Sequence, residues 1–136
     1  MIINESAENY LEAILILHKQ GGNVRSIDIA HHLSFSKPSV SVAMKSLREN
    51  GYINIDENGN ISLTASGTKI AESIFERHQI IANALMSLGV DEKTAFEDSC
   101  KIEHYISDKS FSRIKEHFEN HKPKNTRSGD IDVVLL

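Results

Sequence analysis

The chain has little cysteine, few aromatic residues and no tryptophan. Its 136 residues include a single cysteine, Cys100, and Phe, Tyr and Trp together make up 6% of the sequence. One cysteine excludes an intramolecular disulfide and suits a reducing compartment, where a lone thiol is either a buried small side chain or a metal ligand. The low aromatic content argues against a surface that binds carbohydrate by stacking.

Long apolar runs and a strong excess of one charge are also lacking. No apolar stretch approaches the roughly 20 residues that a membrane span requires, and residues 1–5 have no basic signal-peptide region. We therefore expect a cytoplasmic protein without a membrane partner. Since the net charge is −4, binding to DNA would require basic residues concentrated locally.

The first 50 residues contain three helical patterns. An apolar spacing of three to four residues predicts a helix over about 6–19, ended by Gly21-Gly22. Ser26 is the expected N-cap of a short helix over 27–33, and Ser36 that of another helix, which ends at Asn50-Gly51. Two short helices separated by a turn of about three residues form a helix-turn-helix.

A β-hairpin is expected directly after the helix-turn-helix. Apolar and polar residues alternate over 52–56 and 60–63, and Asn58-Gly59 lies between these two stretches. Period-two alternation around Asn-Gly predicts two antiparallel strands. The order of helix-turn-helix and hairpin is that of a winged helix with a two-stranded wing.

The rest of the chain is predicted to be helical. Thr64 is the expected N-cap of a long helix that Gly89 ends near residue 88, and His78 lies on the apolar stripe of this helix. Asp91 is expected to cap a helix that includes Cys100, Glu103 and Ile106. A last helix starts at Ser107 or Ser110, and residues 121–136 form a polar linker followed by an apolar hexamer to which we assign no role.

Metal-ligating residue types are concentrated in residues 100–104. Cys100, Glu103 and His104 are spaced i, i+3 and i+4, so on a helix their side chains would share one face and could meet at one metal ion. A lone histidine on an apolar face, such as His78, is more often a core residue. Several donors together favour a metal site.

These elements resemble one known family. The segments that carry the resemblance are Asn9-Tyr10-Leu11-Glu12, the winged helix with Ser36-Lys37-Pro38-Ser39-Val40-Ser41, Leu63-Thr64-Ala65-Ser66-Gly67, Arg77-His78, and residues 100–107 with Cys-x-x-Glu-His. Over residues 5–120 the chain is similar to the metal-dependent repressors that include the diphtheria toxin repressor and the manganese transport regulator.

The resemblance implies a mainly α fold with two domains. Residues 1–63 would form a winged-helix DNA-binding domain, residues 64–120 an all-helical metal-binding and dimerisation domain, and residues 121–136 a C-terminal tail. The length is that of the short form of the family, without the SH3-like domain of larger relatives. The implied function is that of a homodimeric repressor of metal homeostasis genes, with a divalent metal as corepressor and operator DNA as partner.

The resemblance also implies site residues. Its metal ligands correspond to Glu12, His78, Cys100, Glu103 and His104. Asn9 stands at a further ligand position, where iron-type members have Met and manganese-type members Asp. At the ancillary-site positions of iron-type members this chain has Ala82 and Phe96, so that site is expected to be absent in its usual form, while a mononuclear and a binuclear main site both stay open.

The softness of the donor atoms and the resemblance point to different sets of metals. Thiolate, imidazole and carboxylate suit Fe(II), Zn(II) or Co(II), whereas Mn(II) prefers a shell rich in oxygen. The resemblance favours Fe(II) or Mn(II) over Zn(II) or Co(II).

The second helix of the helix-turn-helix is the expected recognition helix. Lys45 and Arg48 suit phosphate contacts, and Val42, where iron-type relatives have Gln, can pack on a thymine methyl. The candidate DNA-binding residues are Ser36, Lys37, Pro38, Ser39, Ser41, Val42, Lys45 and Arg48.

Two other functions are compatible with the pattern. A winged-helix regulator could sense a non-metal ligand, with Cys100 and His104 in the core. A metalloenzyme with Glu103 as base ranks lower, because no other catalytic constellation is present. We therefore expect no enzymatic activity.

Overall fold

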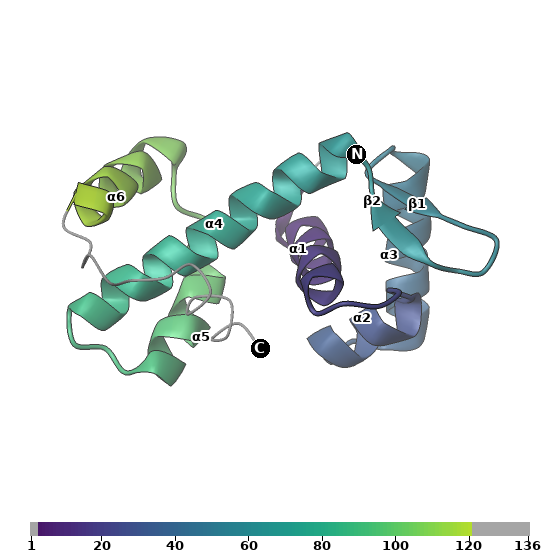
Figure 1. Ribbon diagram of the computed structural model, residues 1–136, viewed down its shortest axis with the longest axis horizontal. Helices are drawn as coiled ribbons and strands as arrows, with labels where there is room; N and C mark the ends of the chain where they lie inside the picture. The colour runs from purple at the N-terminus through teal and green to yellow at the C-terminus, as the bar shows by residue number, and fades with distance from the viewer. Residues whose placement is uncertain (1–2, 121–136) are drawn as a thin grey trace. The chain divides into compact units, whose positions relative to one another are not determined.

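The computed structural model describes residues 3–120, which include six helices and one two-stranded sheet (Figure 1). These residues divide into two compact units, one ending at Ser73 and the other beginning at Ile74. The boundary lies inside helix α4 (Ala65–Ser87). The C-terminal tail and its apolar hexamer lie outside the described residues.

The first unit opens with helix α1 (Glu5–Lys19), which carries much of the apolar core. The side chain of Asn4 caps the helix by accepting a hydrogen bond from the backbone N–H of Ala7 at 2.9 Å. Tyr10, Leu11 and Ile14 recur at helical spacing and are buried in the core, with Leu11 and Ile14 fully enclosed. This face of α1 is the centre on which the other elements of the unit pack.

Helices α2 (Ser26–Leu33) and α3 (Lys37–Glu49) form the predicted helix-turn-helix. Ser34, between them, has a left-handed backbone with φ of 58°. Ser36 caps α3 as expected, since its hydroxyl accepts a hydrogen bond from the N–H of Ser39 at 3.3 Å. The assignment of Ser26 as N-cap was wrong, because it is the first residue of α2. Instead Arg25 takes that position, and its N–H donates to the Asp28 carboxylate at 2.9 Å.

Strands β1 (Ile53–Ile55) and β2 (Ile61–Leu63) pair antiparallel, with Asn54 opposite Ser62, and confirm the hairpin. Gly59 supplies the positive φ of 83° that the turn requires. The N–H of Ile61 donates to the carbonyl of Val24 at 2.7 Å, which joins the hairpin to the segment before α2. The winged helix predicted from the sequence is therefore confirmed.

Helix α4 begins where the hairpin ends. The Thr64 hydroxyl accepts a hydrogen bond from the N–H of Gly67 at 3.2 Å, as an N-cap does, and Gly89 follows the helix with φ of 99°. Gly67 is buried against the hairpin, where an added Cβ would lie 2.0 Å from the carbonyl oxygen of Tyr52. The absence of a side chain at Gly67 is what allows this close approach.

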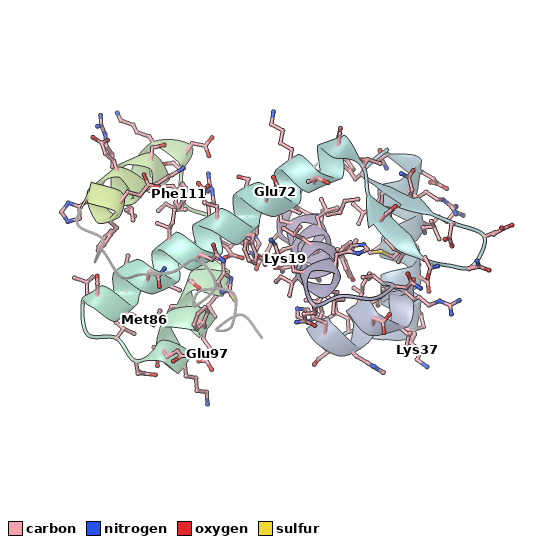
Figure 2. The ribbon with its side chains drawn as sticks, in the orientation of Figure 1. Lys19, Lys37, Glu72, Met86, Glu97 and Phe111 are labelled. Atoms are coloured by element: carbon pink, nitrogen blue, oxygen red, sulfur yellow. The ribbon has the colours of Figure 1, made fainter. Side chains whose placement is uncertain are left out.

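The second unit consists of the remainder of α4, α5 (Glu92–Ile102) and α6 (Asp108–Asn120). Asp91 caps α5 by accepting from the N–H of Thr94 at 3.0 Å, and the Ser107 hydroxyl accepts from the N–H of Ser110 at 3.1 Å before α6. Figure 2 shows Phe111 on the side of α6 that faces α4, and the residue is buried. Within residues 3–120, none of the helices is long and apolar enough to cross a membrane.

Candidate metal centre and nucleic-acid interface

In the second unit, helix α4 contributes one buried imidazole. His78 is 5% exposed, and its ring stacks on that of Phe96 from α5, with 5.4 Å between centroids and 30° between planes. Ala82, one helical turn further along, is also buried. Ala82 and the half-buried Phe96, which stand at the ancillary-site positions named above, carry no metal-ligating atom.

Helix α5 and the turn after it contribute the other donors of this unit. The sequence predicted a helix through residues 100–106, and this was wrong, because α5 ends at Ile102. Glu103 keeps a helical backbone as the C-cap, and the N–H groups of Tyr105 and Ile106 both donate to the carbonyl of Ile102. Residues 103–105 therefore form a turn after the last residue of α5.

The turn still brings the four predicted ligands of this unit into pairwise contact. Nδ1 of His78 lies 3.0 Å from Oε2 of Glu103, and Nε2 of His104 lies 3.4 Å from Oε1 of the same carboxylate. Sγ of Cys100 lies 3.5 Å from Nδ1 and 3.9 Å from Nε2 of His78. Glu103 thus contacts both imidazoles, whereas the exposed Cys100 contacts His78.

The spacing of these donors fits a bound metal. Ligand atoms about 2.0–2.3 Å from a metal ion lie roughly 3 to 4 Å from one another. Three pairs of donors fall in this range: His78 and Glu103 at 3.0 Å, His104 and Glu103 at 3.4 Å, and Cys100 and His78 at 3.5 Å. Glu103 is 1% exposed, and burying a carboxylate is costly unless it is paired or coordinates a cation. The chemistry of the donor set suits a divalent transition metal.

The two other candidate ligands belong to the first unit. Asn9 and Glu12 are three residues apart on α1 and so project from one face of that helix. Glu12 is 7% exposed and Asn9 is half-buried. A buried carboxylate is the kind of group that a cation stabilises.

The recognition helix α3 divides cleanly into two faces. Val40, Met44 and Leu47 are buried in the core of the first unit. All eight candidate DNA-binding residues lie on the exposed side: Ser36, Lys37, Pro38, Ser39, Ser41, Val42, Lys45 and Arg48. Figure 2 shows Lys37 at the start of α3, directed away from the rest of the unit. Val42 is 71% exposed, which leaves its methyl groups available for contact.

One residue of the second unit has contacts that the sequence did not indicate. Arg77, next to His78, donates hydrogen bonds to the carbonyls of Glu103 and Ile106 at 3.3 and 2.8 Å. The only sequence signal was its place beside a candidate ligand, because its partners lie 26 and 29 residues further along the chain.

Both parts of the chain match one family. Residues 3–60 match the iron dependent repressor N-terminal DNA binding domain, and residues 64–129 match the iron dependent repressor metal binding and dimerisation domain. Together these matches cover most of the sequence.

Individual proteins agree with this match. An uncharacterized HTH-type transcriptional regulator of Methanocaldococcus jannaschii is 35% identical over 124 residues, which are 90% of this chain and 99% of that protein. The transcriptional regulator MntR of Escherichia coli is 33% identical over 120 residues, 88% of this chain and 77% of MntR. The solved structure of the manganese regulator SloR superposes with a TM-score of 0.74 at 28% identity over 88% of this chain, which spans 55% of SloR.

Proposed function

Since this chain belongs to the iron-dependent repressor family, we propose that its metal site is formed by His78, Cys100, Glu103 and His104, together with Glu12 and Asn9 from α1. The protein is a metal-responsive, DNA-binding regulator of transcription. The observation that carries the proposed site is the buried Glu103 carboxylate, which lies 3.0 Å from His78 and 3.4 Å from His104, with Cys100 a further 3.5 Å from His78. The assignment of Glu12 and Asn9 rests on the family pattern and on the burial of Glu12.

The metal of this site is a divalent transition metal, and we propose Fe(II) or Mn(II) as the physiological ion. Relatives include regulators named for manganese, and the matched domains are those of iron-dependent repressors. The thiolate of Cys100 favours the softer Fe(II), Co(II) or Zn(II), whereas the oxygen donors of Glu103 and Glu12 also suit Mn(II). Asn9 offers a neutral oxygen where manganese-type members have a carboxylate, so its contribution to Mn(II) affinity is weaker.

The division of ligands between two domains would make the metal a switch. We propose the domain boundary at residues 63/64, which places Glu12 in the DNA-binding domain and His78 in the metal-binding and dimerisation domain. A cation bound by both would favour one arrangement of the DNA-binding domains over others. Without the cation, the carboxylates of Glu12 and Glu103 and any ionised Cys100 would repel one another. By linkage, operator DNA tightens metal binding by the factor by which metal tightens DNA binding.

The working form is a homodimer, in keeping with the matched dimerisation domain. Two recognition helices then read two half-sites of operator DNA, and metal sets their separation. In the second unit Leu88 and Tyr105 are 75% and 77% exposed, and such apolar side chains are candidates for the contact between copies.

We place the protein in the cytoplasm, where its DNA lies, and assign it no enzymatic activity, because its relatives are transcriptional regulators.

The test is a metal titration of DNA binding. Purified protein, kept anaerobic and reduced because oxidation of Cys100 would mislead, is used to select duplexes from a random pool with Mn(II) or Fe(II). Binding to the selected duplex is then measured with Fe(II), Mn(II), Zn(II), Co(II) and a chelator. We expect metal to tighten binding at least tenfold and chelator to reverse it. Equal binding with and without metal would overturn the corepressor role and favour a regulator of another ligand.

A further inference from the structure

The turn that carries Glu103 and His104 has no stop signal of its own. Residues 102–108 contain neither glycine nor proline, the residues that usually end a helix. The carbonyl of Ile102, the last of α5, accepts from the N–H groups of Tyr105 and Ile106, so the carbonyls in the turn that follows need donors from elsewhere. Within the described residues of this turn, side-chain donors from another helix meet the carbonyls of Glu103 and Ile106.

Those donors belong to Arg77 on α4. Its Nη1 donates to the carbonyl of Glu103 at 3.3 Å and to that of Ile106 at 2.8 Å, which spans the turn. Its Nη2 pairs with the Asp108 carboxylate at the start of α6. The centre of the guanidinium lies 5.1 Å from the centroid of the Phe111 ring. The Arg77 side chain is 12% exposed and that of Asp108 is 94% exposed, so the carbonyl contacts are partly shielded from water whereas the ion pair lies at the surface.

We propose that Arg77 is a positioning residue that holds the Glu103–His104 turn in the geometry required for metal binding. It holds the turn by backbone contacts and leaves the ligand atoms themselves untouched. The inference rests on the proposed function, because it takes Glu103 and His104 to be ligands. Groups that orient metal ligands commonly change metal affinity by about 10- to 100-fold when removed.

The position of Arg77 explains how it can act on two ligand-bearing segments at once. It is adjacent to His78 on α4, and adjacent helical residues point about 100° apart. His78 contacts Glu103 while Arg77 reaches the far side of the same turn. Through Asp108 and Phe111 the guanidinium also holds the first turn of α6. The ligand turn and α6 are therefore expected to shift together when Arg77 is removed.

Lysine cannot reproduce this arrangement. A guanidinium is a planar fork with five N–H donors, whereas an ammonium is a compact point charge. A lysine in place of Arg77 could retain the charge opposite Asp108 but not the simultaneous contacts with two carbonyls, a carboxylate and a ring face. The Arg77→Lys variant therefore shows whether metal binding needs only a positive charge at this position or needs the planar guanidinium with its several N–H donors.

The experiment uses the full chain and Co(II) as the probe, because a Co(II)–thiolate bond gives an absorption band that reports on Cys100. Wild type, Arg77→Ala, Arg77→Lys and Asp108→Asn are titrated anaerobically. We expect Arg77→Ala to weaken Co(II) binding by at least tenfold and to change the band. The Co(II) affinity of Arg77→Lys should lie closer to that of Arg77→Ala than to that of the wild type when the affinities are compared as logarithms. Asp108→Asn, which keeps both carbonyl contacts, should lose less than threefold.

Controls separate positioning from simple destabilisation. Arg113→Gln removes an arginine from α6 whose side chain is 75% exposed, and it should bind Co(II) like the wild type. Circular dichroism and the metal-free melting temperature are recorded for each variant. If Arg77→Ala and Arg77→Lys melt lower yet bind Co(II) with unchanged affinity and spectrum, Arg77 is merely structural and the proposal fails. If Glu103→Gln also binds Co(II) like the wild type, the proposed metal site itself is wrong.

Discussion

Nδ1 of His78 and Oε2 of Glu103 lie 3.0 Å apart, with their side chains 6% and 0% exposed. A carboxylate so thoroughly removed from water is stabilised only by a positive partner or by several donors. Either a protonated imidazole or a metal ion could be the positive partner of this carboxylate. Two neighbouring donors, His104 at 3.4 Å from the same carboxylate and Cys100 at 3.5 Å from His78, distinguish this pair from an ordinary buried ion pair.

Glu103→Gln is the sharpest change at this pair. Glutamine has nearly the same shape and keeps an oxygen acceptor, but it lacks the negative charge that attracts a cation. We expect affinity for Mn(II) and Co(II), measured by equilibrium dialysis, to fall by about 10- to 100-fold or more. The matched control is Glu97→Gln, an exposed acidic residue on α5, the helix that Glu103 follows, and this variant should bind like the wild type. Unchanged affinity in Glu103→Gln would remove this carboxylate from the site.

Gly67→Ala should destabilise the protein although alanine is the better helix former. An added Cβ would lie 2.0 Å from the carbonyl oxygen of Tyr52, and that backbone oxygen also accepts from the N–H of Thr64 at 3.1 Å. The hairpin and α4 must then separate, at a cost of about 3 kcal/mol. Chemical denaturation followed by circular dichroism measures the loss. Ser66→Ala, at an exposed neighbouring position, should change stability by less than about 0.5 kcal/mol.

How far the sequence predicted the fold depended on whether the signal was local. Ser36, Asp91 and Thr64 were identified as caps because a cap bonds to a residue three positions away. Ser26 was misassigned because Asp28 offers a carboxylate to the Arg25 N–H, which lets the helix begin one residue earlier than the serine pattern suggests. Competition of this kind between neighbouring polar groups decides at which residue a helix begins.

The end of α5 could not be predicted from its own residues. The sequence after Ile102 has no glycine or proline, yet α5 ends there, and Arg77 donates to the carbonyls of Glu103 and Ile106 in the turn that follows. That partner lies more than 25 residues upstream, so no local pattern shows it. The candidate ligands were nevertheless found, since Cys-x-x-Glu-His is a local pattern that tolerates a change of backbone course after Glu103.

Asp56 provides a prediction for pH. Its carboxylate accepts hydrogen bonds from the N–H groups of Asn60 and Asn58 at 2.9 and 2.8 Å, and these bonds, that of Asn60 first, lower its pKa below the usual 3.8. A depressed pKa means that the stabilisation is present above 3.8 and is lost as the pH falls through the lower, folded value. The amide resonances of Asn58 and Asn60, followed by NMR from pH 6 to 2, should therefore shift with a midpoint below 3.8.

Asp56→Asn is the control for this titration, because an amide does not ionise. In this variant the acid-induced shifts of Asn58 and Asn60 should disappear, while the amides of α1 behave as in the wild type. A midpoint at or above 3.8 in the wild type would show that the hairpin turn does not hold the ionised form.

Val42 and Lys45 should affect DNA binding in different ways. An exposed valine cannot hydrogen-bond a base edge but can cover a thymine methyl, whereas lysine neutralises phosphate. Replacing the contacted thymine of a selected duplex by deoxyuridine removes one methyl group and should weaken wild-type binding about fourfold, the equivalent of about 0.8 kcal/mol. Val42→Ala should be insensitive to that replacement. Lys45→Ala should keep the sensitivity, bind all duplexes more weakly and lower the salt slope by about 1. If no thymine in the selected site distinguishes wild type from Val42→Ala, the valine does not read sequence.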